Sequence, residues 1–452
     1  APNTHTCPVC TGMPGSLPVL NKKVVEYAMA VGLATNCSIT RDCKFDRKNY
    51  FYPDNPQNYQ ISQLYLPICR DGHVDVKLED GTEKSIRIHE IHMEEDAGKL
   101  IHDEWEDVSY VDYNRSGVPL IEIVSEPDMR NAEEVIAYLT KLRNTIQYLG
   151  ASDCKLQEGS MRADVNLSVR EKGSTEFGTR TETKNLNSFS AIQRAIEAET
   201  ARQIDIIEAG GQVVQETRRW NDDKEYSYAM RSKEDAQDYR YFPDPDLVPI
   251  IISDEWMAEV KSKEPEFRDE KMARYISEFN LPEYDADIIT LYKPLADLFE
   301  AAVEKGSAPK EASNWLMGET MRIVKDKGIE PDQVKLTGEN FAKFLKLIEN
   351  DVINKTVAKE VFEAIFDGGV NPEAYVEEHG LKMDNDTDGL KKIIEEVVAN
   401  NPKAAPFDMR KLLSLRTSSS VEYGRLSAAN FRSSSIKRYT SAGSACTKVD
   451  GC

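Results

Sequence analysis

The chain has 452 residues, with 57 Lys and Arg against 78 Asp and Glu, which gives a formal net charge of −21. Apolar residues make up 40% and charged residues 30%, as in globular proteins with a substantial core, and no apolar run approaches the roughly 18 residues of a membrane-spanning helix. The acidic balance excludes a surface covered throughout by nucleic acid but leaves room for a local basic site, and eight cysteines are too few for a disulfide scaffold.

A Cys-x-x-Cys motif, Cys7 to Cys10, opens the chain. This spacing allows two thiolates to reach one tetrahedral zinc ion, but no second pair follows at a suitable distance, so a plain turn or a redox pair remain alternatives. Four scattered cysteines are expected to be reduced single thiols: Cys37, Cys43, Cys69 and Cys154. No charged-then-apolar leader occurs at the start, and we expect a cytoplasmic protein with no membrane partner.

Residues 1–264 carry the mixed pattern of an α+β region. Residues 18–36 have apolar side chains at helical spacing after Asn21, a natural N-cap, and predict an amphipathic helix. Two alternating runs, residues 74–78 and 85–88, are separated by an Asp-Gly turn and predict a β-hairpin.

Further along this region the patterns differ in strength. Residues 45–54 are polar and aromatic without a clear period, and we expect no regular core element there. Residues 161–169 alternate without interruption and predict a strand. A long helix is predicted from Ser188, a natural N-cap, to the glycine pair at 210–211.

Residues 265–380 predict a helical domain. Thr337 is the expected N-cap of one of its helices, and Gly368-Gly369 should end another. A start of a tail domain, residues 381–402, contains one more short helix at 390–398. Residues 403–452 are rich in serine and carry a net charge of +6, against −27 for the rest, and this composition favours a disordered segment.

Two groups of acidic residues carry the first sign of chemistry. Glu94, Glu95 and Asp96 are expected just past a strand, and Glu122 lies in an alternating strand on a face that is otherwise apolar. A buried carboxylate needs a partner. One interpretation pairs Glu122 with an arginine such as Arg115; the other has Glu122 and one of the three consecutive acids converge on Mg²⁺.

Basic and amide side chains near these acids suggest a site for phosphate. Each of them could instead be a solvated face or a helix cap, but together with the acids they favour Mg²⁺-assisted phosphoryl transfer from a nucleotide. No P-loop and no Rossmann glycine pattern occurs, so a conventional P-loop enzyme is excluded. The basic and amide residues are Arg47, Lys48, Asn49, Arg162, Asn166, Lys184 and Asn185, and Asp164 shares a strand face with Arg162 and Asn166.

Five longer motifs resemble the GatB family, the B subunit of aspartyl/glutamyl-tRNA(Asn/Gln) amidotransferase, over about residues 2–402. They occur in the same order as in that family. They are Phe45–Asp54 with Tyr59–Gln63, His92–Lys99, Val111–Pro127, Glu182–Phe189 and Asp238–Asp246.

The resemblance implies a carbon–nitrogen ligase that uses glutamine as the nitrogen donor. Such a protein binds the acceptor end of tRNA carrying a misacylated Glu or Asp and activates the side-chain carboxylate with ATP and Mg²⁺ as an acyl phosphate. Ammonia made by a glutaminase, the A subunit, displaces the phosphate, and a small C subunit holds the two together in a heterotrimer. The implied fold is a cradle domain (1–264) with an antiparallel sheet like that of glutamine synthetase, then a helical domain (265–380) and a small helical tail (381–402), with 403–452 unmatched.

The resemblance also implies roles for single residues. Glu95 and Glu122 match Mg²⁺-binding positions, and Lys48 matches a segment that lines the ammonia path, so these three are the expected catalytic residues. Cys7 and Cys10 match the second half of a four-cysteine zinc site. The expected nucleotide- or substrate-binding residues are Arg47, Arg162, Asp164, Lys184 and Asn185.

The chain departs from the family pattern at both ends. Family members usually carry a Glu-x-His strand and a Cys-x-Cys pair before the point where this sequence starts, and residues after 402 do not resemble the family tail. These departures leave open a non-catalytic tRNA-binding or scaffold remnant. The closest enzyme alternative is another ATP-dependent amide ligase that acts on a free or different carrier-bound acid.

Overall fold

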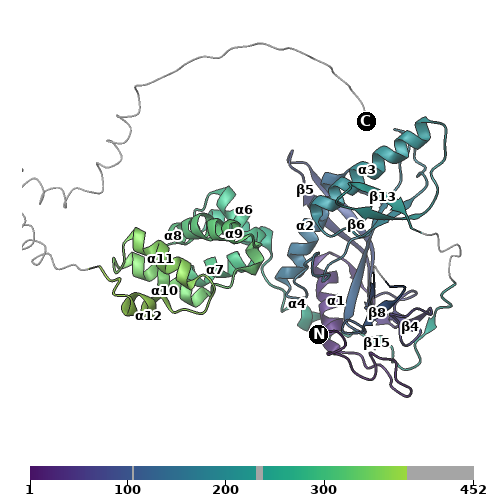
Figure 1. Ribbon diagram of the computed structural model, residues 1–452, viewed down its shortest axis with the longest axis horizontal. Coiled ribbons are helices and arrows are strands. Elements are labelled where there is room, and N and C mark those ends of the chain that lie inside the picture. The colour runs from purple at the N-terminus through teal and green to yellow at the C-terminus, as the bar shows by residue number, and fades with distance from the viewer. Residues whose placement is uncertain (104–105, 231–237, 384–452) are drawn as a thin grey trace, which may run out of the picture.

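The computed structural model describes residues 1–103, 106–230 and 238–383. Figure 1 shows two parts side by side, a strand-rich part that holds the N-terminus and a helical part that begins with α5 (Arg268–Ser277). The expected order, with mixed strands and helices first and helices alone afterwards, is present in the chain. The helix predicted at residues 390–398 and the segment 403–452 lie outside the described residues.

An antiparallel sheet with helices on one face forms the centre of the strand-rich part. Its elements are α1 (Lys22–Ala34), β1 (Ser38–Ile39), β5 (Cys69–Lys77), β6 (Glu83–Glu95), β9 (Pro119–Ser125) and α2 (Ala132–Tyr148). The strand order is β1-β5-β6-β9, and apolar residues of α1 and α2 pack against the sheet. Asn21 caps α1 by accepting a hydrogen bond from the Lys23 backbone N–H, and the β5–β6 hairpin turns at Gly81 with φ 85°. Both predictions are confirmed.

The set of alternate residues that faces the helices changes partway along the β5–β6 hairpin. In β6 the buried residues are even-numbered up to Ile88 and odd-numbered from Ile91. In β5 the same change falls around Asp71, whose φ of 53° is left-handed. β6 also shifts register against β9 directly after Ile88, which is a β-bulge. As a result, His92 and Glu94 face away from the helices.

A second four-stranded sheet has the long helix α3 on one face. Its elements are β10 (Val165–Leu167), β11 (Thr181–Lys184), α3 (Phe189–Glu208), β12 (Thr217–Asn221) and β13 (Tyr226–Ala229). Neighbouring strands are antiparallel except β11 and β12, which are parallel because α3 crosses over between them. Ser188 caps α3 as predicted. The strand expected at 161–169 is shorter, since only residues 165–167 pair with β11.

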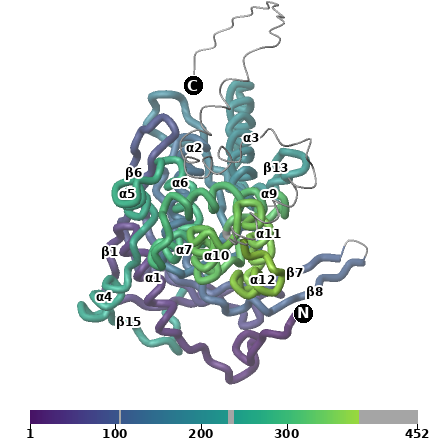
Figure 2. Tube along the Cα trace, turned by 90° about the vertical axis from the view of Figure 1, so that its left-hand side faces the viewer, coloured from purple at the N-terminus to yellow at the C-terminus, as the bar shows by residue number. Residues whose placement is uncertain are grey.

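Short strands join distant parts of the chain. β14 (Phe242–Pro243) pairs with β3 (Asp46–Asn49), which also pairs with β4 (Tyr59–Ser62). A short strand therefore lies within 45–54, where no regular core element was expected, and its pairing with the distant β14 leaves no local signal. Two further pairs are β2 (Asp42–Cys43) with β15 (Ile250–Ile251), and the hairpin β7 (Lys99–His102) with β8 (Ser109–Asp112). Figure 2 shows this hairpin projecting from the body near the N-terminus.

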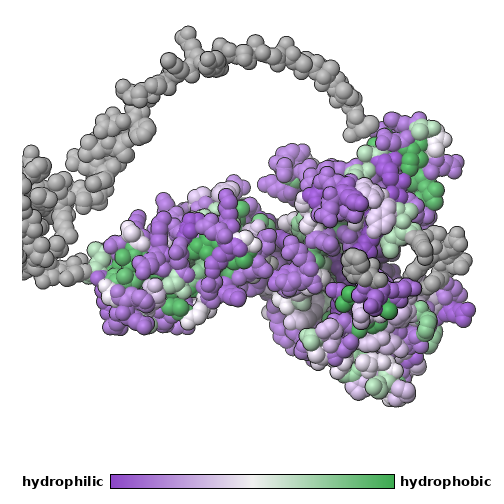
Figure 3. Space-filling model, viewed as in Figure 1, coloured by the Kyte–Doolittle hydropathy of each residue, from purple (hydrophilic) through white to green (hydrophobic). Residues whose placement is uncertain are grey.

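The helical part has its own core. α4 (Asp254–Lys261) precedes this part, which begins with α5. Its further helices are α6 (Glu283–Leu291), α7 (Lys293–Glu304), α8 (Pro309–Trp315), α9 (Met321–Lys327), α10 (Gly338–Glu349), α11 (Lys355–Ile365) and α12 (Pro372–Glu378). A π turn lies at Leu316–Thr320 and a 3₁₀ turn at Pro331–Gln333. Thr337 caps α10 as predicted, and the rings of Trp315, Phe344 and Phe362 pack together in the core. Within the described ranges, none of the helices has the length and apolar character needed to cross a membrane. The surface visible in Figure 3 is mainly hydrophilic, with separate hydrophobic patches.

Candidate active site

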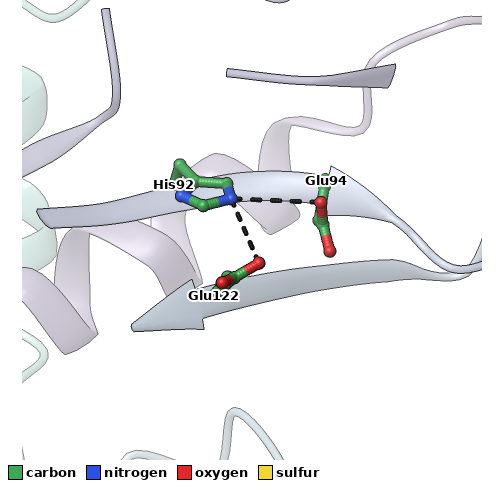
Figure 4. A group of neighbouring side chains, drawn as sticks. All are labelled: His92, Glu94 and Glu122. Atoms are coloured by element: carbon green, nitrogen blue, oxygen red, sulfur yellow. Dashed lines mark ion pairs between the residues drawn. The ribbon is translucent and has the colours of Figure 1, made fainter. Parts of the chain in front are cut away.

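Three side chains that can bind a metal meet on the outer face of the central sheet. His92 and Glu94 are two residues apart on β6 and therefore share a face, and Glu122 lies directly opposite His92 on β9. Their ligand atoms all lie within 4.8 Å of one another. His92 Nε2 is 3.5 Å from Glu122 Oε2 and 3.9 Å from Glu94 Oε2, and Figure 4 shows the three side chains turned toward each other.

The charges in this group, which we call the acid cluster (His92, Glu94 and Glu122), influence one another strongly. The hydrogen bond and charge of the His92 ring lower the pKa of Glu122 against the effect of burial. Burial and the Glu122 charge raise the pKa of Glu94. Burial lowers the pKa of His92, but Glu122, Glu94 and Glu90 together outweigh it, so that the net pKa is raised. The cluster thus carries excess negative charge that a cation would relieve.

The side chain of Glu122 is 55% exposed, so the sequence-based expectation of a buried carboxylate was wrong. The face it shares with Leu120 and Val124 is the outer face of the sheet, whereas Ile121 and Ile123 pack into the core. Its proposed partner Arg115 instead forms an ion pair with Asp96, at 2.9 Å between Arg115 Nε and Asp96 Oδ2. The second interpretation, in which Glu122 meets one of the consecutive acids, is the one that the geometry supports.

The acid that meets Glu122 is Glu94, and the structure does not bring Glu95 to the same place. Both acids lie within β6 and not past its end, so they point to opposite faces. Glu95 accepts a hydrogen bond from the Ile61 backbone N–H at 3.1 Å, beside a small cavity that is also lined by Tyr50 and Gln60. Burial raises the pKa of Glu95 to about 7.

Two of the predicted cationic residues face the acid cluster. The charges of Lys48 and Lys184 both act to lower the pKa of Glu122. Lys184 Nζ is held at 2.9 Å from Asp164 Oδ2, and Lys48 Nζ lies 5.0 Å from the centre of the Tyr239 ring. The structure therefore brings together acids that attract a metal and lysines that attract an anion.

The other predicted binding residues make structural contacts. Arg162 Nη2 lies 2.6 Å from Asp96 Oδ2. The side-chain amide of Asn185 donates to the Trp220 carbonyl oxygen at 3.0 Å, which supports a left-handed backbone with φ 70°.

Arg47 is tied into the fold by two acids that follow β14. Its Nε lies 2.9 Å from Asp244 Oδ2, and its Nη2 lies 2.5 Å from Asp246 Oδ2. The guanidinium group also lies 4.0 Å from the centre of the Tyr59 ring. Through these contacts Arg47, on β3, is linked to the residues that follow β14.

The cysteines of the described residues fall into two groups that differ in burial and spacing. Cys7 and Cys10 lie in the N-terminal segment, Cys7 exposed and Cys10 half-buried, with their sulfur atoms within hydrogen-bonding distance at 3.3 Å. The four single cysteines are free thiols, as predicted. All four are buried, and burial raises the pKa of each of them.

Sequence reasoning missed His92 as a site residue and did not distinguish Glu94 from the two acids that follow it, and it gave Tyr239 and Tyr241 no role. The signal for His92 and Glu94 was the alternation His-Met-Glu, which continues the strand predicted at 85–88. Tyr241 lies close enough for the charge of Glu94 to raise its pKa to about 12, after the larger effect of burial. Its motif was noted without a role, because its proximity to the acids depends on the pairing of β14 with β3.

Comparison with known proteins gives this site a context. Residues 1–258 match the family model of the GatB/GatE catalytic domain, and residues 297–407 match that of the GatB domain. The first match defines a class of catalytic domains whose matched residues here include the whole acid cluster and both lysines.

Curated relatives specify the class further. The B subunit of the aspartyl/glutamyl-tRNA(Asn/Gln) amidotransferase of Lachnospira eligens is 74% identical over 410 residues, covering 89% of this chain and 85% of the relative. The proteins of the same name from Agathobacter rectalis and Caldicellulosiruptor bescii are 69% and 56% identical, over 89% of this chain and 85% and 84% of the relatives. The chain belongs to the GatB family, the B subunit of aspartyl/glutamyl-tRNA(Asn/Gln) amidotransferases.

Proposed function

We propose that this chain is the subunit of a tRNA-dependent amidotransferase that activates the carboxylate of a misacylated amino acid. The substrate is Glu on a glutamine tRNA, Asp on an asparagine tRNA, or both, and the product is the corresponding amide. The observation that carries the proposal is the acid cluster with Lys48 and Lys184 beside it, in a chain 74% identical to a protein of this name.

The chemistry explains why such a site is needed. A carboxylate is a poor electrophile because its oxygen is a poor leaving group. Transfer of the γ-phosphoryl group of ATP to that oxygen gives an acyl phosphate and ADP. Ammonia then attacks the acyl carbon, phosphate leaves and the nitrogen loses a proton. The enzyme positions these groups and neutralises charge on the phosphoryl oxygens.

Lys48 and Lys184 suit the neutralisation of phosphoryl charge, since both ammonium groups lie close enough to Glu122 for their charges to lower its pKa. Lys184 is oriented by Asp164 and by Glu182, at 2.9 and 3.2 Å. The ring of Tyr239 directs Lys48. We assign both lysines to the phosphoryl oxygens, with Lys48 also next to the path that ammonia would take.

The donor set fits Mg²⁺ through its oxygen atoms. Glu94 and Glu122 supply two carboxylates, which with phosphate oxygens and water form the shell that this ion prefers. His92 is a nitrogen donor and less suited to Mg²⁺, so we assign it to orienting Glu122. We therefore place Glu94, not Glu95, beside Glu122 as the second Mg²⁺ ligand. When bound, the ion supplies positive charge to the transferred phosphoryl group.

The partners follow from the same assignment. The names of the relatives describe one subunit of an assembly that acts on tRNA, and we propose that this chain works with the glutaminase, or A subunit, with a small C subunit, and with the acceptor end of the tRNA. We further propose that residues 1–264 form a cradle related to glutamine synthetase and that 265–380 and 381–402 are separate domains. A scaffold without catalysis is not favoured, because the acid cluster and both lysines are present.

Reconstitution tests the function. With the A and C subunits, Mg²⁺, ATP and glutamine, the chain is expected to convert Glu-tRNA(Gln) to Gln-tRNA(Gln), which is measured by chromatography of the amino acid released from the tRNA. Free glutamate should not be amidated, because the tRNA positions the substrate. Equal conversion of free glutamate would instead indicate an amide ligase for free acids, and complex formation without any amide would indicate a scaffold.

Zinc is proposed at the Cys7–Cys10 pair, which would provide two of the four ligands of a structural site. Metal analysis of the purified protein after dialysis is expected to find zinc that is lost in the double variant Cys7→Ser/Cys10→Ser. The matched control Cys37→Ser alters a buried thiol and should leave the zinc content unchanged. Equal zinc in the double variant and the control would rule the site out.

A further inference from the structure

One face of the second sheet is covered by α3, and no helix or strand among the described residues covers the other. Trp220 and the apolar residues of β10 pack under α3. On the open face, Lys184, Arg219 and Tyr228 are neighbours in one row across β11, β12 and β13. Tyr226 lies on the same face, two residues before Tyr228, with the two ring centres 6.1 Å apart.

These residues are presented to solvent. The tyrosines are 46% and 41% exposed, and Arg219 is also exposed. Among the described residues, the Arg219 side chain has no ion pair and no hydrogen bond. Its neighbour Arg218, on the covered face, is bound to Glu199, Glu216 and Ser227. The guanidinium of Arg219 and the neighbouring tyrosine rings can therefore bind a ligand.

The row also leads to the candidate active site. Lys184 stands at one end, where its charge acts on Glu122, and Tyr228 stands at the other end, two strands away. Neighbouring strands are about 4.8 Å apart. A chain of nucleotides laid along the row would therefore have its end at the acid cluster.

We propose that Tyr226, Tyr228 and Arg219 form a platform for the unpaired 3′ end of the RNA substrate, with bases stacked on the rings and a backbone phosphate on Arg219. The proposal rests on the proposed function for the identity of the RNA. Open sheet faces with exposed aromatic residues stack single-stranded bases, and two rings offer room for two bases. A mononucleotide such as ATP is usually enclosed in a concave pocket, so the open face favours RNA.

Binding of a defined RNA to the assembled heterotrimer tests the platform. The probe is an RNA stem-loop with an unpaired 3′ end of about four nucleotides that contains fluorescent 2-aminopurine, and the reference is the same stem-loop with a blunt end. Tyr226→Ala and Tyr228→Ala are each expected to weaken binding of the overhang about tenfold, and to reduce quenching of the probe. Arg219→Gln should lower the salt dependence of binding by about one phosphate contact.

Controls separate stacking from loss of structure. Tyr228→Phe keeps a ring and should bind the overhang like the wild type, and Tyr284→Ala removes a tyrosine that is 69% exposed on α6 and should have no effect. None of the changes should alter binding of the blunt stem-loop or of ATP. If ATP binding falls while overhang binding is unchanged, the platform serves the adenine of the nucleotide and the proposal is overturned.

Unchanged overhang binding in both alanine variants also overturns it. Binding is read without ATP or amide formation, so that failure of the platform and failure of the proposed function give different results.

Discussion

Replacing Glu122 by Gln is expected to lower kcat for amide formation by about a hundredfold to a thousandfold. The substitution keeps the size of the side chain but removes one of the two carboxylates that we assign to Mg²⁺, and it removes a negative charge that helps to raise the pKa of His92. The loss should appear as slower ADP release with charged tRNA, and as a higher Mg²⁺ concentration for half-maximal rate. Binding of the tRNA itself should change little, because Glu122 is not on the proposed platform.

The matched control is Glu126→Gln, the same chemical change four residues further along the chain. Glu126 follows β9 and contacts His89 at 2.9 Å, outside the acid cluster. Its replacement should leave kcat within about twofold of the wild type, as is usual for surface substitutions away from a site. Equal rates for the wild type and the Glu122 variant would show that the metal assignment is wrong.

Replacing Arg47 by Met is expected to destabilise the strand-rich part by about 3–5 kcal/mol. Arg47 neutralises Asp244, whose side chain is 0% exposed, and its loss would leave that carboxylate buried without a counter-charge. β14 would then be held on β3 by little more than its few backbone hydrogen bonds. Chemical denaturation, followed by tryptophan fluorescence and far-UV circular dichroism, measures the change.

Arg87→Met provides the comparison. The guanidinium of Arg87 also makes two contacts with aspartate oxygens, but both belong to Asp128. It contacts Asp128 at 2.9 and 2.7 Å, but its side chain is 65% exposed. Its replacement should cost less than about 1 kcal/mol, as for other exposed ion pairs. A similarly small cost at Arg47, combined with weaker ATP binding, would restore the role in nucleotide binding that the family resemblance implied.

Local signals explain what could be predicted from the sequence. Asn21, Ser188 and Thr337 each cap the helix that was expected after them, because a cap acts within three residues. The Asp-Gly turn likewise located the hairpin between β5 and β6. The longer motifs located the family before any geometry was known.

The remainder depends on contacts that a pattern along the chain does not contain. Arg47 was expected at a ligand, but its partner Asp244 lies 197 residues away. To distinguish Glu94 from Glu95, one must know that β6 continues to Glu95. One must also know whether even- or odd-numbered residues are buried after the bulge, which we call the parity. That parity is decided by the backbone near Asp71 and Ile88, and Gly72, inside β5 next to Asp71, is the residue there whose type indicates an irregular strand.

The reversal of faces along the β5–β6 hairpin lets one pair of strands do two jobs. On both sides of the reversal, the buried residues of the hairpin pack against the helices. The position of the reversal determines which alternate residues of β6 lie on the outer face of the sheet. Which residues face the acid cluster thus depends on the number of residues between the bulge and His92. Insertion of a single residue into β6 between the bulge and His92 would exchange His92 and Glu94 for core residues. This stretch of the strand should therefore tolerate substitutions better than a change in length.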